Sequence, residues 1–205
     1  MTKNGYTVHI LPDCIISYDK KKLPELLLLR KQGQLGRRAS QIYGSVISEN
    51  GDTMTKILFV CHGNICRSPM AEFVMKDIAA KAGLSDEFLI ESAATSTEEI
   101  GNPVYPPARR KLQEHGIACD GKTARQVRRA DYDKFDLIIG MDEENMCNLR
   151  RLFHGDPEGK LSLLMDYTAR PGSVADPWYT RDFEATWKDV LEGCTGLLCD
   201  ICDIA

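Results

Sequence analysis

The sequence lacks any hydrophobic run long enough to cross a bilayer. Its longest candidate, LPELLLLR at 23–30, is far too short for a membrane-spanning helix. The N-terminus lacks the basic, apolar and small-residue pattern of a secretory signal peptide. A net charge of −4 creates no strong positive field, so neither nucleic acid nor a membrane is expected as a partner. These absences predict a globular cytoplasmic protein.

The sequence also lacks the pattern of a disulfide-rich secreted protein. Its 8 cysteines are irregularly spaced along 205 residues and follow no signal peptide, which favours free thiols in a reducing compartment. Cys194, Cys199 and Cys202 lie close together, but they share one amphipathic stretch with Leu198 and Ile201. We therefore expect buried thiols there rather than a metal site.

The first 53 residues differ from the rest in charge. They contain 8 Lys or Arg and 5 Asp or Glu, a net charge of +3, which leaves 18 basic and 25 acidic residues, a net charge of −7, for the remainder. The polar, turn-rich segment SENGDTMTK at 48–56 marks the change. The sequence thus predicts an N-terminal extension of unknown role over 1–53 and a domain over 54–205.

Strand and helix patterns alternate from Lys56 onward. Apolar runs predict four strands, at 56–60, 88–94, 135–141 and 160–167. Amphipathic segments predict four helices, with Ser68 as the N-cap of the first, at 68–83, 107–116, 142–153 and 180–202. This alternation predicts an α/β fold of three layers, a four-stranded parallel sheet flanked by helices. Ligands of such sheets bind at the C-terminal ends of the strands.

One loop at such a strand end, CHGNICRS at 61–68, carries the chemistry. Gly63 and Asn64 tolerate positive φ, so the loop can turn its N–H groups toward an anion at the start of the next helix. Arg67 can grip two phosphate oxygens with its planar guanidinium. Donors around Cys61, among them the Ser68 hydroxyl, favour its thiolate form. The loop therefore predicts a phosphate cradle with a nucleophile, where the alternative is a turn with two buried cysteines.

The extended sequence VCHGNICRSPMAE at 60–72 resembles the signature of low-molecular-weight protein tyrosine phosphatases. The resemblance continues in family order and covers about residues 55–200, through ESAATS at 91–96, IGNPVYPPA at 100–108, HGI at 115–117, FDLIIGMDEEN at 135–145 and DPWY at 176–179. It implies that 54–205 is a phosphatase domain that hydrolyses aryl phosphate monoesters, with a phosphotyrosine-containing protein as substrate. It also implies that no metal and no cofactor is needed, because arginine and backbone supply the positive field.

The resemblance implies a role for each catalytic residue. Cys61 is expected to be the nucleophile that forms a phosphocysteine, and Arg67 is expected to bind the phosphoryl group. Asp176, before Pro177, is expected to be the general acid and then the general base. The remaining residues expected to shape the phosphate and substrate site are His62, Gly63, Asn64, Ile65, Cys66, Ser68, Ser92, Trp178 and Tyr179.

Within that set, Asn64 and Ser92 are expected to share a hydrogen bond that holds the loop. Trp178 and Tyr179 are expected to line a slot for an aromatic ring. Cys66 is either inert packing or a redox partner of Cys61, with the redox role favoured by its place in the cradle.

Three alternatives to a tyrosine phosphatase remain open. Arginine-phosphatase relatives resemble CTGNTCRS at this loop, with threonine where this chain has Ile65, and the apolar residue favours a phenyl ring at the mouth of the slot. An arsenate reductase of the same fold needs a close pair of further cysteines, whereas Cys119 and Cys147 are 28 positions apart. An idle phosphate-binding module is expected to lose the nucleophile or the acid, and both are present.

Overall fold

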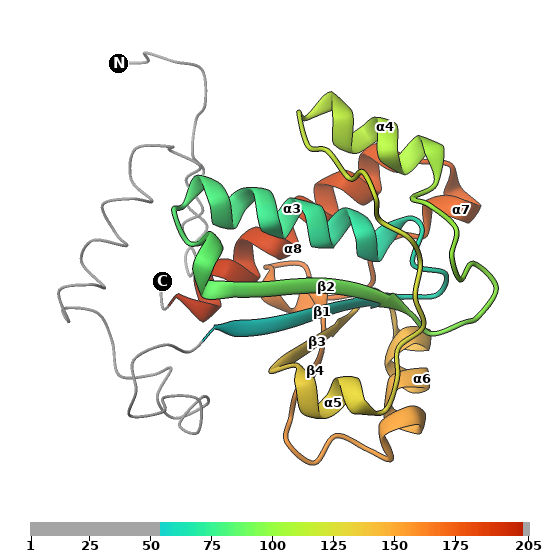
Figure 1. Ribbon diagram of the computed structural model, residues 1–205, viewed down its shortest axis with the longest axis vertical. Coiled ribbons are helices and arrows are strands. Elements are labelled where there is room, and N and C mark those ends of the chain that lie inside the picture. Colours follow the sequence, from blue (N-terminus) through green and yellow to red (C-terminus); the bar gives the residue numbers. More distant parts are fainter. Residues whose placement is uncertain (1–53, 203–205) are drawn as a thin grey trace, which may run out of the picture.

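The computed structural model describes residues 54–202, so the expected extension over 1–53 lies outside the described residues. Four strands pair in parallel in the order β2-β1-β3-β4 (Figure 1). They are β1 (Thr55–Cys61), β2 (Phe88–Ala94), β3 (Leu137–Gly140) and β4 (Leu161–Leu163). The predicted four-stranded parallel sheet is confirmed.

Helices cover both faces of this sheet. Figure 1 shows α3 and α8, with α4 and α7 beside them, on one face and α5 and α6 on the other. Their bounds are α3 (Arg67–Lys81), α4 (Pro106–Glu114), α5 (Ala130–Lys134), α6 (Glu143–Phe153), α7 (Pro177–Thr180) and α8 (Phe183–Ile201), with short 3-10 turns η1 (Ser85–Glu87) and η2 (Leu164–Tyr167). The three-layer arrangement is therefore confirmed.

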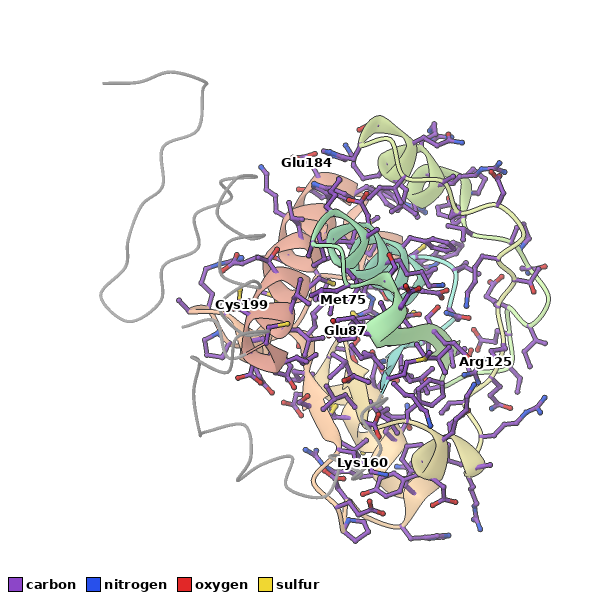
Figure 2. The ribbon with its side chains drawn as sticks, turned by 60° about the vertical axis from the view of Figure 1, so that its left-hand side comes forward. Met75, Glu87, Arg125, Lys160, Glu184 and Cys199 are labelled. Atoms are coloured by element: carbon purple, nitrogen blue, oxygen red, sulfur yellow. The ribbon has the colours of Figure 1, made fainter. Side chains whose placement is uncertain are left out.

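The central strand β1 is apolar throughout because both of its faces are covered. Ile57 and Phe59 pack in the core under α3 and α8, where Met75, labelled in Figure 2, is fully buried. Leu58 and Val60 point the other way, into a second core with residues of α5 and α6. A strand buried on both faces reads as a continuous apolar run rather than an alternating one.

Among the predicted elements, the fourth strand and the last helix differ most from the structure in their bounds. The fourth strand stops at Leu163, and the chain continues as η2, because the Asp166 carboxylate accepts a hydrogen bond from the Leu163 N–H at 3.0 Å. The last helix begins at Phe183 rather than at 180. Arg181 adopts a left-handed φ of 60°, which separates α7 from α8, and the Asp182 side chain then caps α8.

The helix after β1 begins two residues earlier than predicted. Its first residue is Arg67 and its N-cap position is Cys66, which makes no side-chain capping bond. The expectation that Ser68 caps this helix is therefore wrong. The Ser68 hydroxyl is used inside the cradle instead, where it contacts the sulfur of Cys61.

The C-terminal ends of the strands gather at one edge of the sheet. β1 ends at Cys61, β2 at Ala94 and β3 at Gly140, so the loops that follow these three strands meet there. This edge is where parallel sheets bind ligands.

Among residues 54–202, no helix combines the length and the apolar character needed to cross a membrane.

Candidate active site

The cradle is the loop that leads from Cys61 into α3. Asn64 has a φ of 57°, as a tight anion-wrapping loop requires. Gly63, in contrast, does not adopt a positive φ. A Cβ on Gly63 would lie 3.1 Å from Cγ of Glu99. The space beside Gly63 is thus narrow, and a side chain there would have to shift that of Glu99.

The sulfur of Cys61 lies among hydrogen-bond donors. The residue is only 3% exposed, and the Asn64 N–H donates to Sγ at 3.3 Å. The Ser68 Oγ lies 3.0 Å from Sγ and accepts from Asn64 Nδ2 at 2.9 Å, so its own hydrogen is available to the sulfur or, at 3.4 Å, to the Ala93 carbonyl. Donors arranged in this way stabilise a thiolate.

The expected bond between Asn64 and Ser92 is present, and it belongs to a longer chain. Asn64 Nδ2 donates to Ser92 Oγ at 2.7 Å, and Ser92 Oγ donates to Glu72 Oε2 at 2.6 Å. The ammonium groups of Lys122 and Lys76 lie 2.9 and 2.6 Å from the Glu72 carboxylate. Sequence reasoning missed Glu72 and its two lysines.

Two opposing effects act on Glu72. Its burial favours the neutral acid, but Lys122, Lys76 and the Ser92 hydroxyl together hold its pKa below the ordinary value. An ionised Glu72 accepts from Ser92, which in turn fixes the orientation of the Asn64 amide. The loop conformation is thereby tied to the buried carboxylate of Glu72 on α3 and to its lysine partners.

Arg67 is buried and is held by two carboxylates. Nη1 donates to Asp142 Oδ2 at 2.5 Å and to the Val174 carbonyl at 3.3 Å, while Nη2 donates to Asp176 Oδ2 at 2.6 Å. Burial works against its charge, but the negative groups Cys61, Asp176 and Asp142 raise the pKa of Arg67 overall. The cradle therefore contains a permanent cation.

Asp142 is a site residue that the sequence reasoning predicted only as a helix cap. That role is present, since its Oδ1 accepts from the Asn145 N–H at 2.7 Å. The signal that points to its second role is its position, because it follows β3 at the same sheet edge as the cradle.

Asp176 lies where a general acid is expected. It adopts an extended conformation before Pro177, and its Oδ1 accepts from the Trp178 N–H at 2.9 Å as the N-cap of α7. Its other oxygen contacts Arg67. The structure thus brings Cys61, Arg67 and Asp176 to one place from three separate elements.

The aromatic residues after Asp176 are exposed to different degrees. Trp178 is 43% exposed and packs on Tyr105 with ring centroids 5.3 Å apart, whereas Tyr179 is 82% exposed. Ile65 is only 9% exposed and packs with Ala124 against Tyr105 and a phenylalanine of α8. Ile65 therefore offers a smaller open edge than expected at the mouth of a slot.

His62 and Cys66 occupy opposite environments in the loop. The His62 ring is exposed, with Nε2 3.2 Å from Glu98 Oε2. Cys66 is buried, and burial first, then the charges of Cys61 and Asp176, raise the pKa of its thiol far above the ordinary value. Cys66 is thus a neutral thiol beside the expected nucleophile.

No group of three or more potential metal ligands occurs within residues 54–202.

Comparisons with known proteins agree with this geometry. Residues 56–203 match the family model described as low molecular weight phosphotyrosine protein phosphatase. The low molecular weight protein-tyrosine-phosphatase YfkJ of Bacillus subtilis is 42% identical over 150 residues, which cover 72% of this chain and 96% of that protein. The low molecular weight phosphotyrosine protein phosphatase 1 of Drosophila melanogaster is 38% identical, with 70% and 94% covered.

The crystal structure of YfkJ extends the similarity to the fold. It superimposes with a TM-score of 0.72 at 41% identity and covers 74% of this chain and 97% of that one. The chain therefore belongs to the low molecular weight phosphotyrosine protein phosphatase family.

Proposed function

We propose that this protein tyrosine phosphatase acts on phosphotyrosine side chains of proteins, with Cys61 as its nucleophile. The observation that carries the proposal is the convergence of three groups in one cradle. The Cys61 sulfur accepts from a backbone N–H, the Arg67 guanidinium is buried nearby, and the Asp176 carboxylate contacts that guanidinium. A nucleophile, an anion-binding cation and a proton donor are the groups that a phosphoryl transfer of this kind requires.

The first step forms a phosphocysteine. The Cys61 thiolate attacks phosphorus, an S–P bond forms, and the P–O bond to the tyrosine oxygen breaks. Asp176, as the neutral acid, gives its proton to the leaving oxygen. Arg67, together with loop N–H groups such as that of Asn64, balances the charge on the three phosphoryl oxygens that do not react.

The second step releases phosphate. Asp176, now a carboxylate, takes a proton from a water molecule that attacks phosphorus. The S–P bond breaks, inorganic phosphate leaves, and the thiolate of Cys61 is restored. Both steps use residues of this chain alone, and the buried Arg67 supplies the positive charge.

Phosphate entry requires Arg67 to exchange partners. Its Nη2 now donates to Asp176, and a phosphoryl oxygen competes for that same donor. Asp142 holds Nη1 from the rigid start of α6, so the guanidinium keeps its plane while Asp176 is released to face the leaving group. The exchange couples substrate binding to placement of the acid.

Two further parts of the proposal concern the substrate and the compartment. The exposed Trp178, with Tyr105 behind it, gives a flat apolar surface at the rim on which a phenyl ring can rest. Because the mechanism needs Cys61 as a free thiol, we also propose a cytoplasmic location, where thiols are kept reduced.

One assay tests the proposal against its rivals. Matched peptides that carry phosphotyrosine, phosphoarginine or phosphoserine are hydrolysed side by side, and kcat/KM is compared. Phosphotyrosine is expected to lead by roughly 10-fold or more, the scale of one well-chosen pocket contact. Cys61→Ser is the control, which is expected to bind the phosphopeptide without turnover. A preference for phosphoarginine, or substantial turnover by Cys61→Ser, contradicts the proposal.

A further inference from the structure

A second hollow lies beside the cradle. It has a volume of about 420 Å³, and its polar lining residues are His62, Thr95, Ser96, Gln126, Asn148 and Arg151. His62 follows the nucleophile directly in sequence. The Thr95 N–H donates to the Cys61 carbonyl at 2.9 Å, and the Ser96 N–H donates to the His62 carbonyl at 3.0 Å. The hollow is therefore joined to the catalytic loop by backbone hydrogen bonds.

The lining of this hollow is rich in donors and contains no carboxylate. Arg151 Nη1 donates to Asn148 Oδ1 at 3.3 Å, and within residues 54–202 no Asp or Glu lies within ion-pair distance of Arg151. The same contact leaves the Asn148 amide N–H groups free to donate. The acid at this rim, Glu98, contacts the His62 ring instead. Within a chain in which acids outnumber bases by 30 to 26, such a lining favours an anionic ligand.

Thr95 adds an unused polar group. Its Oγ1 is buried without a hydrogen-bond partner, the one such side-chain atom among the described residues. A buried hydroxyl without a partner costs free energy, so native structures contain few of them. Thr95 lines the hollow, so a ligand bound there offers this hydroxyl a partner through a change of its χ1 rotamer.

We propose that this hollow, here called the donor pocket, binds a carboxylate side chain of the substrate, from an Asp or Glu close in sequence to the phosphotyrosine. The inference rests on the proposed function. Successive residues of an extended peptide are about 3.3–3.6 Å apart. The wall of the pocket begins at His62, one residue after the nucleophile. A substrate residue within about three positions of the phosphotyrosine is therefore close enough to reach the pocket.

The ligand is a carboxylate rather than a second phosphoryl group. Phosphate recognition by side chains uses clusters of arginines, whereas the donor pocket has only Arg151. One planar guanidinium pairs well with one carboxylate, and the Asn148, Gln126 and Thr95 side chains supply the neutral donors around it. The donor pocket thus recognises an acidic residue near the phosphotyrosine, while the cradle binds the phosphoryl group.

The test compares peptides that differ in one charge. Glu or Gln is placed at each position from three before to three after the phosphotyrosine, and the Glu-to-Gln ratio of kcat/KM is measured at each. At one or two positions the full-length protein is expected to prefer Glu by about three- to tenfold, the range of a charged hydrogen bond partly open to water. The effect is expected in KM, because the contact is made equally in the ground and transition states.

Variants identify the residue responsible. Arg151→Gln is expected to lower the Glu-to-Gln ratio of kcat/KM to about one. Arg151→Lys is expected to retain part of the preference for Glu. The matched control is Arg150→Gln, which removes the same charge from an exposed neighbour on α6 that does not line the pocket. It is expected to keep the preference. Thr95→Val, which removes only the hydroxyl, is expected to lower the ratio without lowering the melting temperature.

Each other outcome counts against the donor pocket. A ratio near one at every position in the full-length protein overturns it, as does an equal loss in Arg150→Gln, which would indicate only a long-range field. If Arg151→Gln changes inhibition by inorganic phosphate but leaves the ratio intact, the pocket takes a free anion and the proposal is wrong. Failure to hydrolyse any phosphotyrosine peptide contradicts the proposed function instead.

Discussion

Asp142 and Asp176 both contact Arg67, but their supports differ. The second oxygen of Asp142 caps α6, a helix of 11 residues, while that of Asp176 caps α7, a helix of only 4. A carboxylate at the start of a long packed helix is fixed, whereas one on a single isolated turn moves at low cost. Asp142 thus suits a positioning role and Asp176 the transfer of a proton.

This difference predicts how two variants respond to the leaving group. Asp176→Asn removes the proton donor, so hydrolysis of an alkyl-substituted phenyl phosphate is expected to slow by about a hundredfold or more. A nitrophenyl phosphate, whose leaving group needs little protonation, is expected to lose much less. Asp142→Asn is the control and is expected to lower kcat for both substrates equally. Equal losses for both substrates in Asp176→Asn contradict its role as the acid.

The raised pKa of the Cys66 thiol predicts a pH-dependent response to peroxide. Peroxide converts the Cys61 thiolate to a sulfenic acid, and Cys66 then attacks that sulfur to form a disulfide and release water. Because Cys66 remains protonated at neutral pH, its thiolate fraction and the rate of bridging are expected to rise with pH, by up to about tenfold per unit.

Mass spectrometry of the oxidised protein at several pH values measures this bridge. Cys66→Ser is the control, and after exposure to peroxide it is expected to recover less activity on addition of a thiol than the unaltered protein. Equal recovery of the two proteins shows that Cys66 is inert packing.

The contact between α8 and η2 depends on two glycines. A Cβ on Gly196 would lie 1.9 Å from the carbonyl oxygen of Tyr167, and one on Gly193 would lie 2.5 Å from the Leu164 side chain. The missing side chains let the helix lie directly against the turn that follows β4.

Gly196→Ala is therefore expected to destabilise the protein. In an exposed helix this substitution is worth about 1 kcal/mol of stabilisation, but overlap with a backbone carbonyl costs about 1–3 kcal/mol or more. We expect a net loss of about 1–2 kcal/mol in the free energy of unfolding, measured by urea denaturation. Lys188→Ala, at an exposed position of the same helix, is the control. A midpoint that is unchanged or higher in Gly196→Ala contradicts the close contact.

The elements that the sequence predicted well are those set by local signals. The strand at 88–94 agrees with β2 residue for residue, and the acidic cap at Asp142 begins α6 as expected. The early end of β4 was missed because the apolar pattern continues to Met165, whereas the Asp166 carboxylate accepts from the Leu163 N–H and begins a 3-10 turn. The break between α7 and α8 was missed because it depends on a left-handed Arg181, and arginine carries no sequence signal for that conformation.

The residues of the candidate site likewise differ in whether local sequence or only the whole fold reveals their role. The cradle is one contiguous loop, so its residue types and spacing predicted an anion site directly. The contacts of Arg67 with Asp142 and Asp176 join residues 75 and 109 positions apart, and only the fold brings them together. The chain from Asn64 through Ser92 to Glu72 likewise needed β2 and α3 to be placed. Sequence reasoning therefore found the groups that react and the Asn64–Ser92 pair that holds the loop, but it missed Glu72 and the contact of Asp142 with Arg67.

A domain boundary is proposed between residues 1–53 and 54–205. The family model begins at residue 56, and YfkJ is covered over 96% of its own length by 150 residues of this chain. All of the proposed catalytic residues and the two larger hydrophobic cores lie within the described residues 54–202. A chain that begins at Met54 thus keeps every contact derived above, and we expect it to hydrolyse an aryl phosphate with kcat/KM similar to that of the full chain.

Steady-state hydrolysis and thermal unfolding of the two chains side by side measure this. The Cys61→Ser form of the shorter chain serves as the blank. An insoluble or inactive product would show that residues 1–53 complete the domain. Equal activity with a lower melting temperature would show that they stabilise it without taking part in catalysis, and would move the boundary of the folding unit but not that of the active site.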